Sequence, residues 1–492
     1  MKISSAYFLM PLLALAGASC ASDNHEPESS ATVRSAWVSL DISMDNVTRA
    51  MIDDPADPSS EIDRVNVYLT EGTDGNEVIK AVGIGDMNTK KFTDPTGKTT
   101  MNIKASIDAA SPIEIGKTYR IRVVANARML NPLSSASVIG TASAHNDIKW
   151  EYDLTEFSDI SRKGLPLDGM PMAAVGTADC ATVTIEDGKG TENDPYTSTG
   201  SVTLTRMMSA IDYNPGNEKN EYDVEKHNVK VKFLSMQPVN VVKETYLVQR
   251  VLSTPAGLVQ SPASPTLYGA LPATSYTAPV AALQEVNSTR YMIPSGSTEH
   301  VCYVTENVPA KGDVSLKRAT GVIFTAKLVR TADTPSEIAG YIDGAGHPDL
   351  AYFDDGTYQS GLMKYDSEKH KGANWHLVKW ETIKVGTGET PESGYIVRYL
   401  KTIRHGGITP DNIAPVGADK ASAAATDGKI DDMEYATVRG HRYVMRIAGV
   451  TQLPHPYNPN DTPEDGKGDI DIEVQVPTNW NYHRRLEELN NF

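Results

Sequence analysis

Residues 36–44, AWVSLDISM, carry an apolar side chain at every second position. Successive side chains of a β-strand point to opposite faces of a sheet, so this period of two predicts a strand with one apolar face. That face is formed by Ala36, Val38, Leu40, Ile42 and Met44. A polar connector, DNVTRA at residues 45–50, follows directly and is expected to end the strand.

The same period of two recurs along the chain, and clusters of Pro, Gly, Asn and Asp separate the segments that show it. Strands are predicted at residues 64–69, 118–126, 201–211, 229–234, 301–305, 320–329, 394–403, 441–450 and 469–476. Helical periodicity is confined to residues 148–158 and 482–490. The pattern predicts an all-β chain of two β-sandwich domains in tandem with a few short helices. The polar segment 212–225 is the expected boundary, which gives domains at 50–215 and 216–453.

Composition and motifs exclude several classes of function. The chain has 492 residues, with 46 Lys and Arg against 63 Asp and Glu, and a net charge of −17. A chain this acidic lacks the positive surface that nucleic acids require, so no nucleic-acid partner is expected. His370 and His376 have no further residues at metal-ligand spacing, and no nucleophile or phosphate-binding motif occurs. We therefore expect no enzyme activity, no metal and no cofactor.

The first twenty residues have the features of an export signal. Lys2 precedes a short apolar run at residues 6–16, and small residues lead to Cys20. A run this short does not span a bilayer, so residues 1–20 are predicted to be a signal peptide. Small residues ending at a cysteine predict a lipoprotein signal, in which Cys20 is lipidated. The alternative is plain signal cleavage near Ala18 or Ser19, with Cys20 an incidental thiol. The polar residues 21–30 then form a tether.

Cys180 and Cys302 are the other two cysteines. They could pair in an oxidising compartment, but they lie far apart in the sequence and are expected in different domains. Two separate buried thiols are the favoured interpretation.

Two segments near opposite ends of the chain share one pattern. Residues 469–476, DIDIEVQV, have the same period and nearly the same apolar register as residues 36–44. Their apolar face is formed by Ile470, Ile472, Val474 and Val476. They follow a linker rich in Pro, Asn and Gly at 454–468, so residues 454–492 are expected to form a linker and a strand that can reach a neighbour. Such a strand could replace residues 36–44 by donor-strand addition, whereas on spacing alone both segments fit better as ordinary strands of their own domains.

Removal of the early strand requires a cut in the connector that follows it. Arg49 lies in that short polar connector, which a trypsin-like protease can open. Cleavage between Arg49 and Ala50 removes residues 21–49 and leaves two sheet edges without a partner. Arg34 is a competing site, but a cut there leaves residues 36–44 in place.

Several segments carry a family resemblance. In the first half these are GKTYRIRVVANA (116–127) and SVTLTRMMSAI (201–211), and later CYVTENVP (302–309) and ATGVIFTAKL (319–328). Those of the closing region are GTYQSGLMKYD (356–366), GYIVRYLKTIRH (394–405), VRGHRYVMRIAGV (438–450) and DIDIEVQVPTNW (469–480). With the lipoprotein signal and the early strand that leads to Arg49, they resemble Bacteroidales type V pilus subunits. The C-terminal part is most similar to the minor, Mfa-type shaft fimbrillin.

The resemblance implies two transthyretin-like β-sandwich domains and export as a lipoprotein to the outer membrane. It further implies cleavage by a trypsin-like or Arg-specific protease after Arg49, with Ala50 as the mature N-terminus. Residues 36–44 are then the removed strand and residues 469–480 the donor, which joins copies into a fimbrium at the cell surface. The helical pattern of residues 482–492 departs from what a donor tail needs.

The function that follows from this resemblance is a fimbrial shaft subunit that supports adhesion and biofilm formation. Its expected partners are further copies of itself, other fimbrial subunits, the protease and a host or bacterial surface ligand. One alternative is an anchor or tip pilin; an anchor keeps its lipid and stays uncut at Arg49. Another is a surface lipoprotein that captures glycans, for which Trp375 and Trp380 are the candidate platform, although core packing explains them better.

Overall fold

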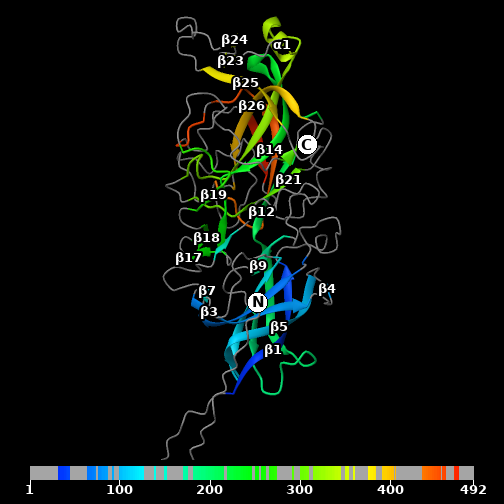
Figure 1. The fold of residues 1–492 in the computed structure, drawn as a ribbon, viewed down its shortest axis with the longest axis vertical. Coiled ribbons are helices and arrows are strands. Elements are labelled where there is room, and N and C mark those ends of the chain that lie inside the picture. Colours follow the sequence, from blue (N-terminus) through cyan, green and yellow to red (C-terminus); the bar gives the residue numbers. More distant parts are fainter. Residues whose placement is uncertain are drawn as a thin grey trace, which may run out of the picture.

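A computed structural model provides the fold. The residues that it describes are 31–44, 62, 64–73, 76–86, 91–93, 99–126, 138–139, 149–151, 170–174, 181–214, 219–246, 250–253, 256–261, 265–273, 291–292, 300–309, 314–344, 350–353, 358–360, 375–383, 391–403, 405, 435–455, 457–460 and 470–475. The molecule is elongated, with the early strands at one end and the later strands at the other (Figure 1).

The first large sheet is built from the early strands. Its members are β1 (Thr32–Met44), β2 (Val65–Thr73), β3 (Asn76–Asp86), β4 (Lys91–Thr93), β5 (Thr99–Glu114), β6 (Thr118–Ala125), β7 (Val138–Ile139), β9 (Met172–Ala174), β10 (Ala181–Thr184) and β11 (Tyr196–Arg206). The order is β4-β5-β1-β11-β10-β6-β2-β3-β7, and β9 pairs with β11 and β6. Because β5 pairs with β3 as well as with β1, the sheet closes on itself around a core.

The second large sheet is built from the later strands. Its members are β12 (Met208–Asn214), β13 (Glu221–Val224), β14 (Val229–Val239), β20 (Tyr291–Met292), β21 (His300–Thr305), β22 (Gly321–Arg330), β23 (Leu350–Phe353), β24 (Tyr358–Ser360), β25 (Trp375–Ile383), β26 (Glu392–Thr402), β27 (Arg442–Val450) and β28 (Ile470–Gln475). The order is β21-β12-β27-β13-β14-β22-β26-β25-β23-β24, with β20 on β14 and β28 on β27.

Short strand pairs and helices complete the described structure. The pairs are β8 (Lys149–Glu151) with β16 (Glu244–Tyr246), β15 (Val241–Val242) with β19 (Leu267–Tyr268), and β17 (Arg250–Ser253) with β18 (Ala256–Gln260). The helices are the 3₁₀ turn η4 (Glu225–His227) and α1 (Ser336–Ile342), and α1 lies at the far end of the molecule (Figure 1). Within these described parts no helix is long and apolar enough to cross a membrane.

The prediction of an all-β chain with few helices is confirmed, and its sheets are consistent with β-sandwich units in tandem. Each range predicted as a strand contains strand residues. The expected helix at 148–158 is wrong, because residues 149–151 form β8 and pair with β16. The predicted helix at 482–490 lies outside the described residues.

The change from one sheet to the other falls at Met207. The pattern of residues 201–211 predicts one strand, but β11 ends at Arg206 in the first sheet and β12 starts at Met208 in the second. The expected domain boundary after residue 215 therefore does not follow the strand pairing. The Met207 amide donates a hydrogen bond to Pro171 O at 2.8 Å, which fixes the chain where it passes between the sheets.

Candidate functional site

Strand β1 lies in the interior of the first sheet, between β5 and β11. It runs antiparallel to β5, with pairs from Thr32 and Glu114 to Ser43 and Thr100. It runs parallel to β11, with pairs that end at Met44 and Leu204. We call the place between β5 and β11 that this strand fills the β1 site. Loss of β1 would leave β5 and β11 with unpaired backbone groups along one edge each.

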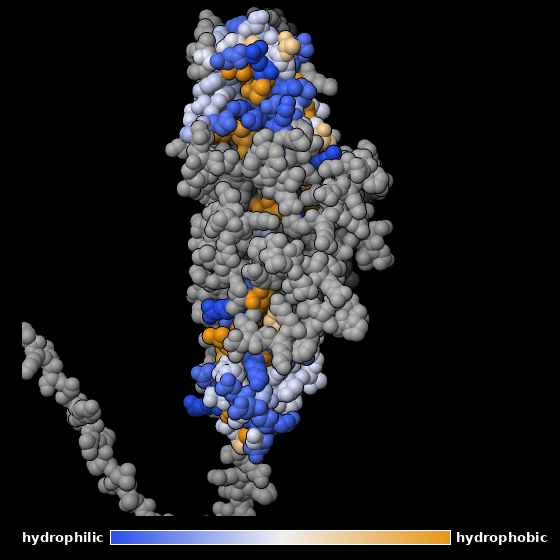
Figure 2. Space-filling model, turned by 90° about the vertical axis from the view of Figure 1, so that its right-hand side faces the viewer, coloured by the Kyte–Doolittle hydropathy of each residue, from blue (hydrophilic) through white to orange (hydrophobic). Residues whose placement is uncertain are grey.

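One face of β1 belongs to the hydrophobic core. Its members are between 0 and 4% exposed and are Ala36, Val38, Leu40 and Ile42. On the opposite face Trp37 and Ser39 are half-buried, Asp41 is exposed and Ser43 is buried. The side chain of Met44 lies outside the described residues. Figure 2 shows that the described surface at the lower end, where the first sheet lies, is mainly hydrophilic.

Few polar side chains tie β1 to its neighbours. Asn102 Nδ2 donates to Asp41 Oδ1 at 2.8 Å, and Ser39 Oγ donates to Asn102 Oδ1 at 3.3 Å. On the other side, the Ser43 and Thr203 hydroxyls lie 3.3 Å apart. The strand is therefore held mainly by backbone hydrogen bonds and by its apolar face. Another strand with the same alternation could make both kinds of contact.

The loop between β10 and β11, residues 185–195, covers one end of the β1 site. The Trp37 amide donates to Gly190 O at 2.9 Å, and Lys104 Nζ of β5 donates to Glu192 O at 3.2 Å. Gly190 has a φ of +91°, and a Cβ atom there would lie 2.6 Å from the Tyr196 ring. Only glycine therefore fits at this turn, which holds the loop against the buried Tyr196.

The late strand β28 lies on β27. The two pair antiparallel, from Val444 with Gln475 to Val450 with Ile470. Among the described strands β28 has no other partner, whereas β27 also pairs with β12 and β13. Within the described structure β28 is thus an edge strand, held on one side only. Val476 lies outside the described residues.

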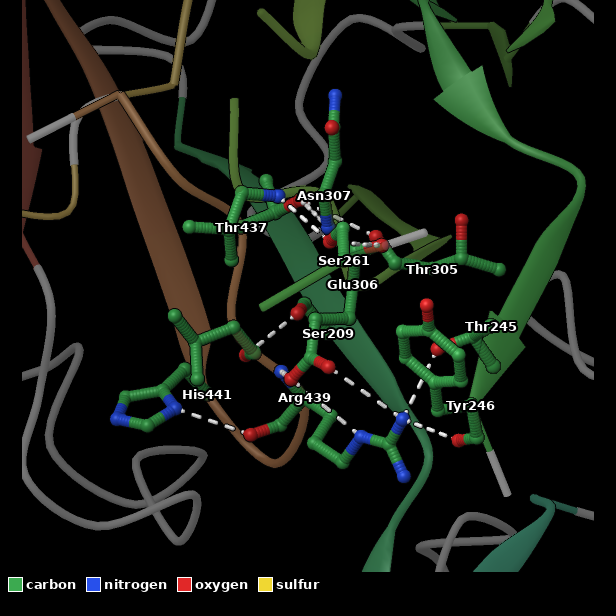
Figure 3. A network of polar contacts seen from close by, with 12 residues as sticks. Ser209, Thr245, Tyr246, Ser261, Thr305, Glu306, Asn307, Thr437, Arg439 and His441 are labelled. Carbon is green, nitrogen blue, oxygen red and sulfur yellow. Dashed lines mark hydrogen bonds and ion pairs between the residues drawn. The ribbon is translucent and has the colours of Figure 1, made fainter. Parts of the chain in front are cut away.

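A buried polar network surrounds the turn that precedes β27 (Figure 3). Arg439 Nη2 donates to Thr245 Oγ1 at 2.9 Å and to Tyr246 O at 2.6 Å, and Arg439 Nε lies 3.4 Å from Glu306 Oε2. Both ionic side chains are almost fully buried. The next residue, Gly440, donates its amide to Met208 O at 2.9 Å. The network therefore fixes β16 and the start of β12 to this turn.

Two histidines lie against each other beside this network. The rings of His405 and His441 have centroids 4.9 Å apart, and His405 Nδ1 lies 2.8 Å from Tyr443 Oη. Burial, and to a smaller extent the neighbouring His441, lowers the pKa of His405 to about 3. Burial also lowers the pKa of His441. Both imidazoles are thus neutral at pH 7 and belong to the packed interior.

Of the predicted cysteines and cleavage site, only Cys302 lies among the described residues. Cys302 is a free, buried thiol whose pKa is raised by burial and by Asp212, while Cys180 lies outside the described residues. Cys20, Arg49 and Ala50 also lie outside the described residues, so lipidation and cleavage stay predictions.

The two tryptophans proposed as a glycan platform lie on β25. Trp380 is half-buried and packs edge-on against Tyr395, with ring centroids 5.3 Å apart. The side chain of Trp375 lies outside the described residues. Packing against the core accounts for Trp380 without a ligand.

Sequence reasoning missed the Arg439 network and the ion pair between Arg442 and Asp212. Each joins residues more than 100 positions apart, so no local spacing reveals it. Among the described residues no group of three or more His, Cys, Asp or Glu is placed to hold a metal ion.

No protein-family model and no curated protein matches the chain. Several solved structures are similar to it. The tip fimbrial protein Mfa3 from Porphyromonas gingivalis is 11% identical with a TM-score of 0.38, and the match covers 90% of this chain and 99% of that one. A protein from Parabacteroides distasonis that has been proposed to be a cell adhesion protein is 14% identical with a TM-score of 0.39. That match covers 91% of this chain and 100% of the other. The fimbrial anchor protein Mfa2 from Porphyromonas gingivalis is 11% identical with a TM-score of 0.25, covering 66% and 94%. Fimbrial proteins are therefore among the structures to which this chain is similar.

Proposed function

We propose that the protein is a structural shaft subunit of a cell-surface fimbria, with a role in adhesion and biofilm formation. Copies join when β1 is removed by proteolysis and residues 469–476 of a neighbouring copy take its place. The observation that carries this proposal is the position of β1: an interior, apolar strand at the start of the described chain, which precedes the connector with Arg49.

The contacts of β1 suit a strand that can be exchanged. Backbone hydrogen bonds to β5 and β11 do not depend on side chains, so any strand of suitable length can make them. Val38, Leu40 and Ile42 contribute about 1.5–3 kcal/mol each by burial. An incoming strand with aliphatic residues at alternate positions recovers a similar amount, less about 1–2 kcal/mol for each residue that it orders. Proteolysis makes the exchange irreversible.

The C-terminal strand supports the role of donor. In the described structure β28 pairs with β27 alone, so its release breaks one ladder of backbone hydrogen bonds. In the β1 site the same residues gain two ladders, one on β5 and one on β11. Because the second ladder adds backbone hydrogen bonds, transfer of the strand from β27 to the β1 site of another copy is favoured.

The proposed order of events begins with export and lipidation at Cys20, which holds the precursor at the outer membrane. A trypsin-like or Arg-specific protease then cuts after Arg49, and Ala50 becomes the mature N-terminus. The other partners are further fimbrial subunits and a surface ligand on a host or bacterial cell. No catalytic role is part of this proposal.

The test is the N-terminus of the assembled protein. Protein purified from surface fimbriae should give a sequence that starts at Ala50. Arg49→Ala should abolish ladders of oligomers that resist sodium dodecyl sulfate, while the matched control Arg34→Ala should keep them. An assembled protein with an intact lipidated Cys20 would instead favour an anchor subunit.

A further inference from the structure

We propose that the donor strand, residues 470–476, enters the β1 site in the direction opposite to β1. This inference rests on the proposed function above and adds the direction and the register of insertion. Backbone pairing leaves the direction open. Strand β1 is antiparallel to β5 and parallel to β11, and a reversed strand would be parallel to β5 and antiparallel to β11.

Side-chain size favours the reversed direction. The apolar face of β1 increases in size along the chain, from Ala36 through Val38 to Leu40 and Ile42, and all four are buried. The apolar face of the donor decreases in size, from two isoleucines to two valines. In reverse, three places receive a side chain of equal size: Val38 by Val474, Leu40 by Ile472 and Ile42 by Ile470. One place, that of Ala36, receives a larger residue.

The forward direction fits less well in the same register. It places Ile470 in the position of Ala36, where three more carbon atoms must enter a packed core. It also places the proline at 477 in the position of Ser43, at the last pair of the ladder with β5, where a proline has no N–H group to donate. In reverse that proline takes the place of Ser35, where the register of β1 on β5 shifts. A forward strand displaced by two residues, with Ile470 in the position of Val38, avoids both conflicts. The charges at the ends of the strand distinguish this register from the reversed one.

The loop 185–195 makes the ends of the β1 site different. It contacts β1 at Trp37, and its acidic side chains are exposed. These are Glu186, Asp187, Glu192 and Asp194, against one Lys. A forward donor brings the linker 454–469 to this loop, and that linker also has four acidic residues against one Lys. A reversed donor brings residues 477–485, in which Arg484 and Arg485 are the charged side chains and which precede Glu487 and Glu488. The charges nearest the donor are therefore opposite to those of the loop in the reversed direction and like them in the forward direction.

Cysteine cross-links between copies test the direction. In the reversed strand Gln475 takes the place of Trp37, which pairs with Ser106 of β5. In the forward strand it takes the place of Asp41, opposite Asn102, and in the displaced forward strand it lies opposite Thr100. Three full-length double variants each carry Gln475→Cys together with Ser106→Cys, Asn102→Cys or Thr100→Cys. Each variant is cleaved by the protease, oxidised and boiled without reductant.

We expect a covalent ladder with Ser106→Cys and none with the other two. A ladder through Asn102→Cys or Thr100→Cys would overturn the reversed direction, as would a polymer that none of the three cross-links. If cleaved protein forms no polymer before oxidation, the proposed function itself fails. The uncut precursor of each variant is the control, because β1 still fills the site.

The charge contact has a separate readout. Arg484→Glu with Arg485→Glu should slow ladder formation about tenfold at low salt. Adding Glu192→Lys and Asp194→Lys in the loop should restore the rate, while Lys467→Glu in the linker should leave it unchanged. Assembly of the double Arg variant at the wild-type rate would overturn the contact between the tail and the loop.

Discussion

Leu40 lies at the centre of the apolar face of β1 and is 1% exposed. Its neighbours Val38 and Ile42 on the same face are equally buried, so the residue has core on both sides. Asp41 between them is exposed and bonds to Asn102. The apolar positions that the period of two predicts in β1 are thus the buried ones.

Leu40→Ala in the uncut precursor should lower the stability of the first sheet by about 2–5 kcal/mol, because it leaves a cavity in a packed core. Ser35→Ala, on an exposed position of the same strand, should change it by less than about 0.5 kcal/mol. Thermal unfolding followed by calorimetry measures both. Equal, small effects would mean that β1 is not part of the core.

His405 makes stability depend on pH. Its pKa in the folded chain is about 3, lower than the ordinary value of 6.5, so the unfolded chain takes up a proton first as the pH falls. This contribution is complete above pH 6.5 and is lost between pH 6.5 and pH 3. Between pH 7 and pH 5 the free energy of unfolding should fall by about 2 kcal/mol from this residue.

Urea unfolding at pH 7 and at pH 5 tests the role of His405. His405→Gln should reduce the difference between the two pH values, because glutamine does not titrate. The carboxylates titrate mostly below this range and add little to the difference. An unchanged difference in the variant would show that His405 is protonated in the folded chain at pH 5.

At the level of secondary structure, alternation identified the strands because apolar and polar faces differ wherever a sheet has a core. It missed the end of β11 at Arg206, since β12 continues the strand pattern in the second sheet. It also missed α1, whose seven residues bury only Ile338 and so give little periodicity. Residues 149–151 show a helical pattern but pair with β16, because tertiary contacts override local preference.

The candidate site was predictable in part for the same reason. The strand at 36–44 and its inward residues follow from a local pattern. Its neighbours β5 and β11 do not, because they pair with it across long stretches of sequence. The contact of loop 185–195 with Trp37 likewise depends on the folded arrangement.

Arg439 connects the turn before β27 to β16. Arg439→Ala should destabilise the second sheet by about 3–5 kcal/mol, since Glu306 is left charged and buried. Arg330→Ala is the control, because its ion pair with Asp343 is exposed on both sides and is worth less than about 1 kcal/mol. Chemical denaturation measures the two variants. A small loss for Arg439→Ala would mean that the network does not hold β16.

Across the molecule, the β1 site and the proposed donor strand β28 are connected by one series of paired strands. β1 pairs with β11, which continues through Met207 into β12. β12 pairs with β27, and β27 holds β28. The site to be filled lies in one sheet and the strand that fills it in the other. An elongated subunit with this arrangement can extend a fibre in one direction by repeating a single contact.

The most direct test mixes two full-length variants after exposure to the protease. Arg49→Ala keeps β1 in place, so this copy can donate but not accept. Ile472→Asp spoils the apolar face of the donor, so this copy can accept but not donate. Each alone should remain a monomer by light scattering, and the mixture should form a one-to-one dimer that grows no further. No dimer in the mixture, or ladders from either variant alone, would contradict strand exchange between copies.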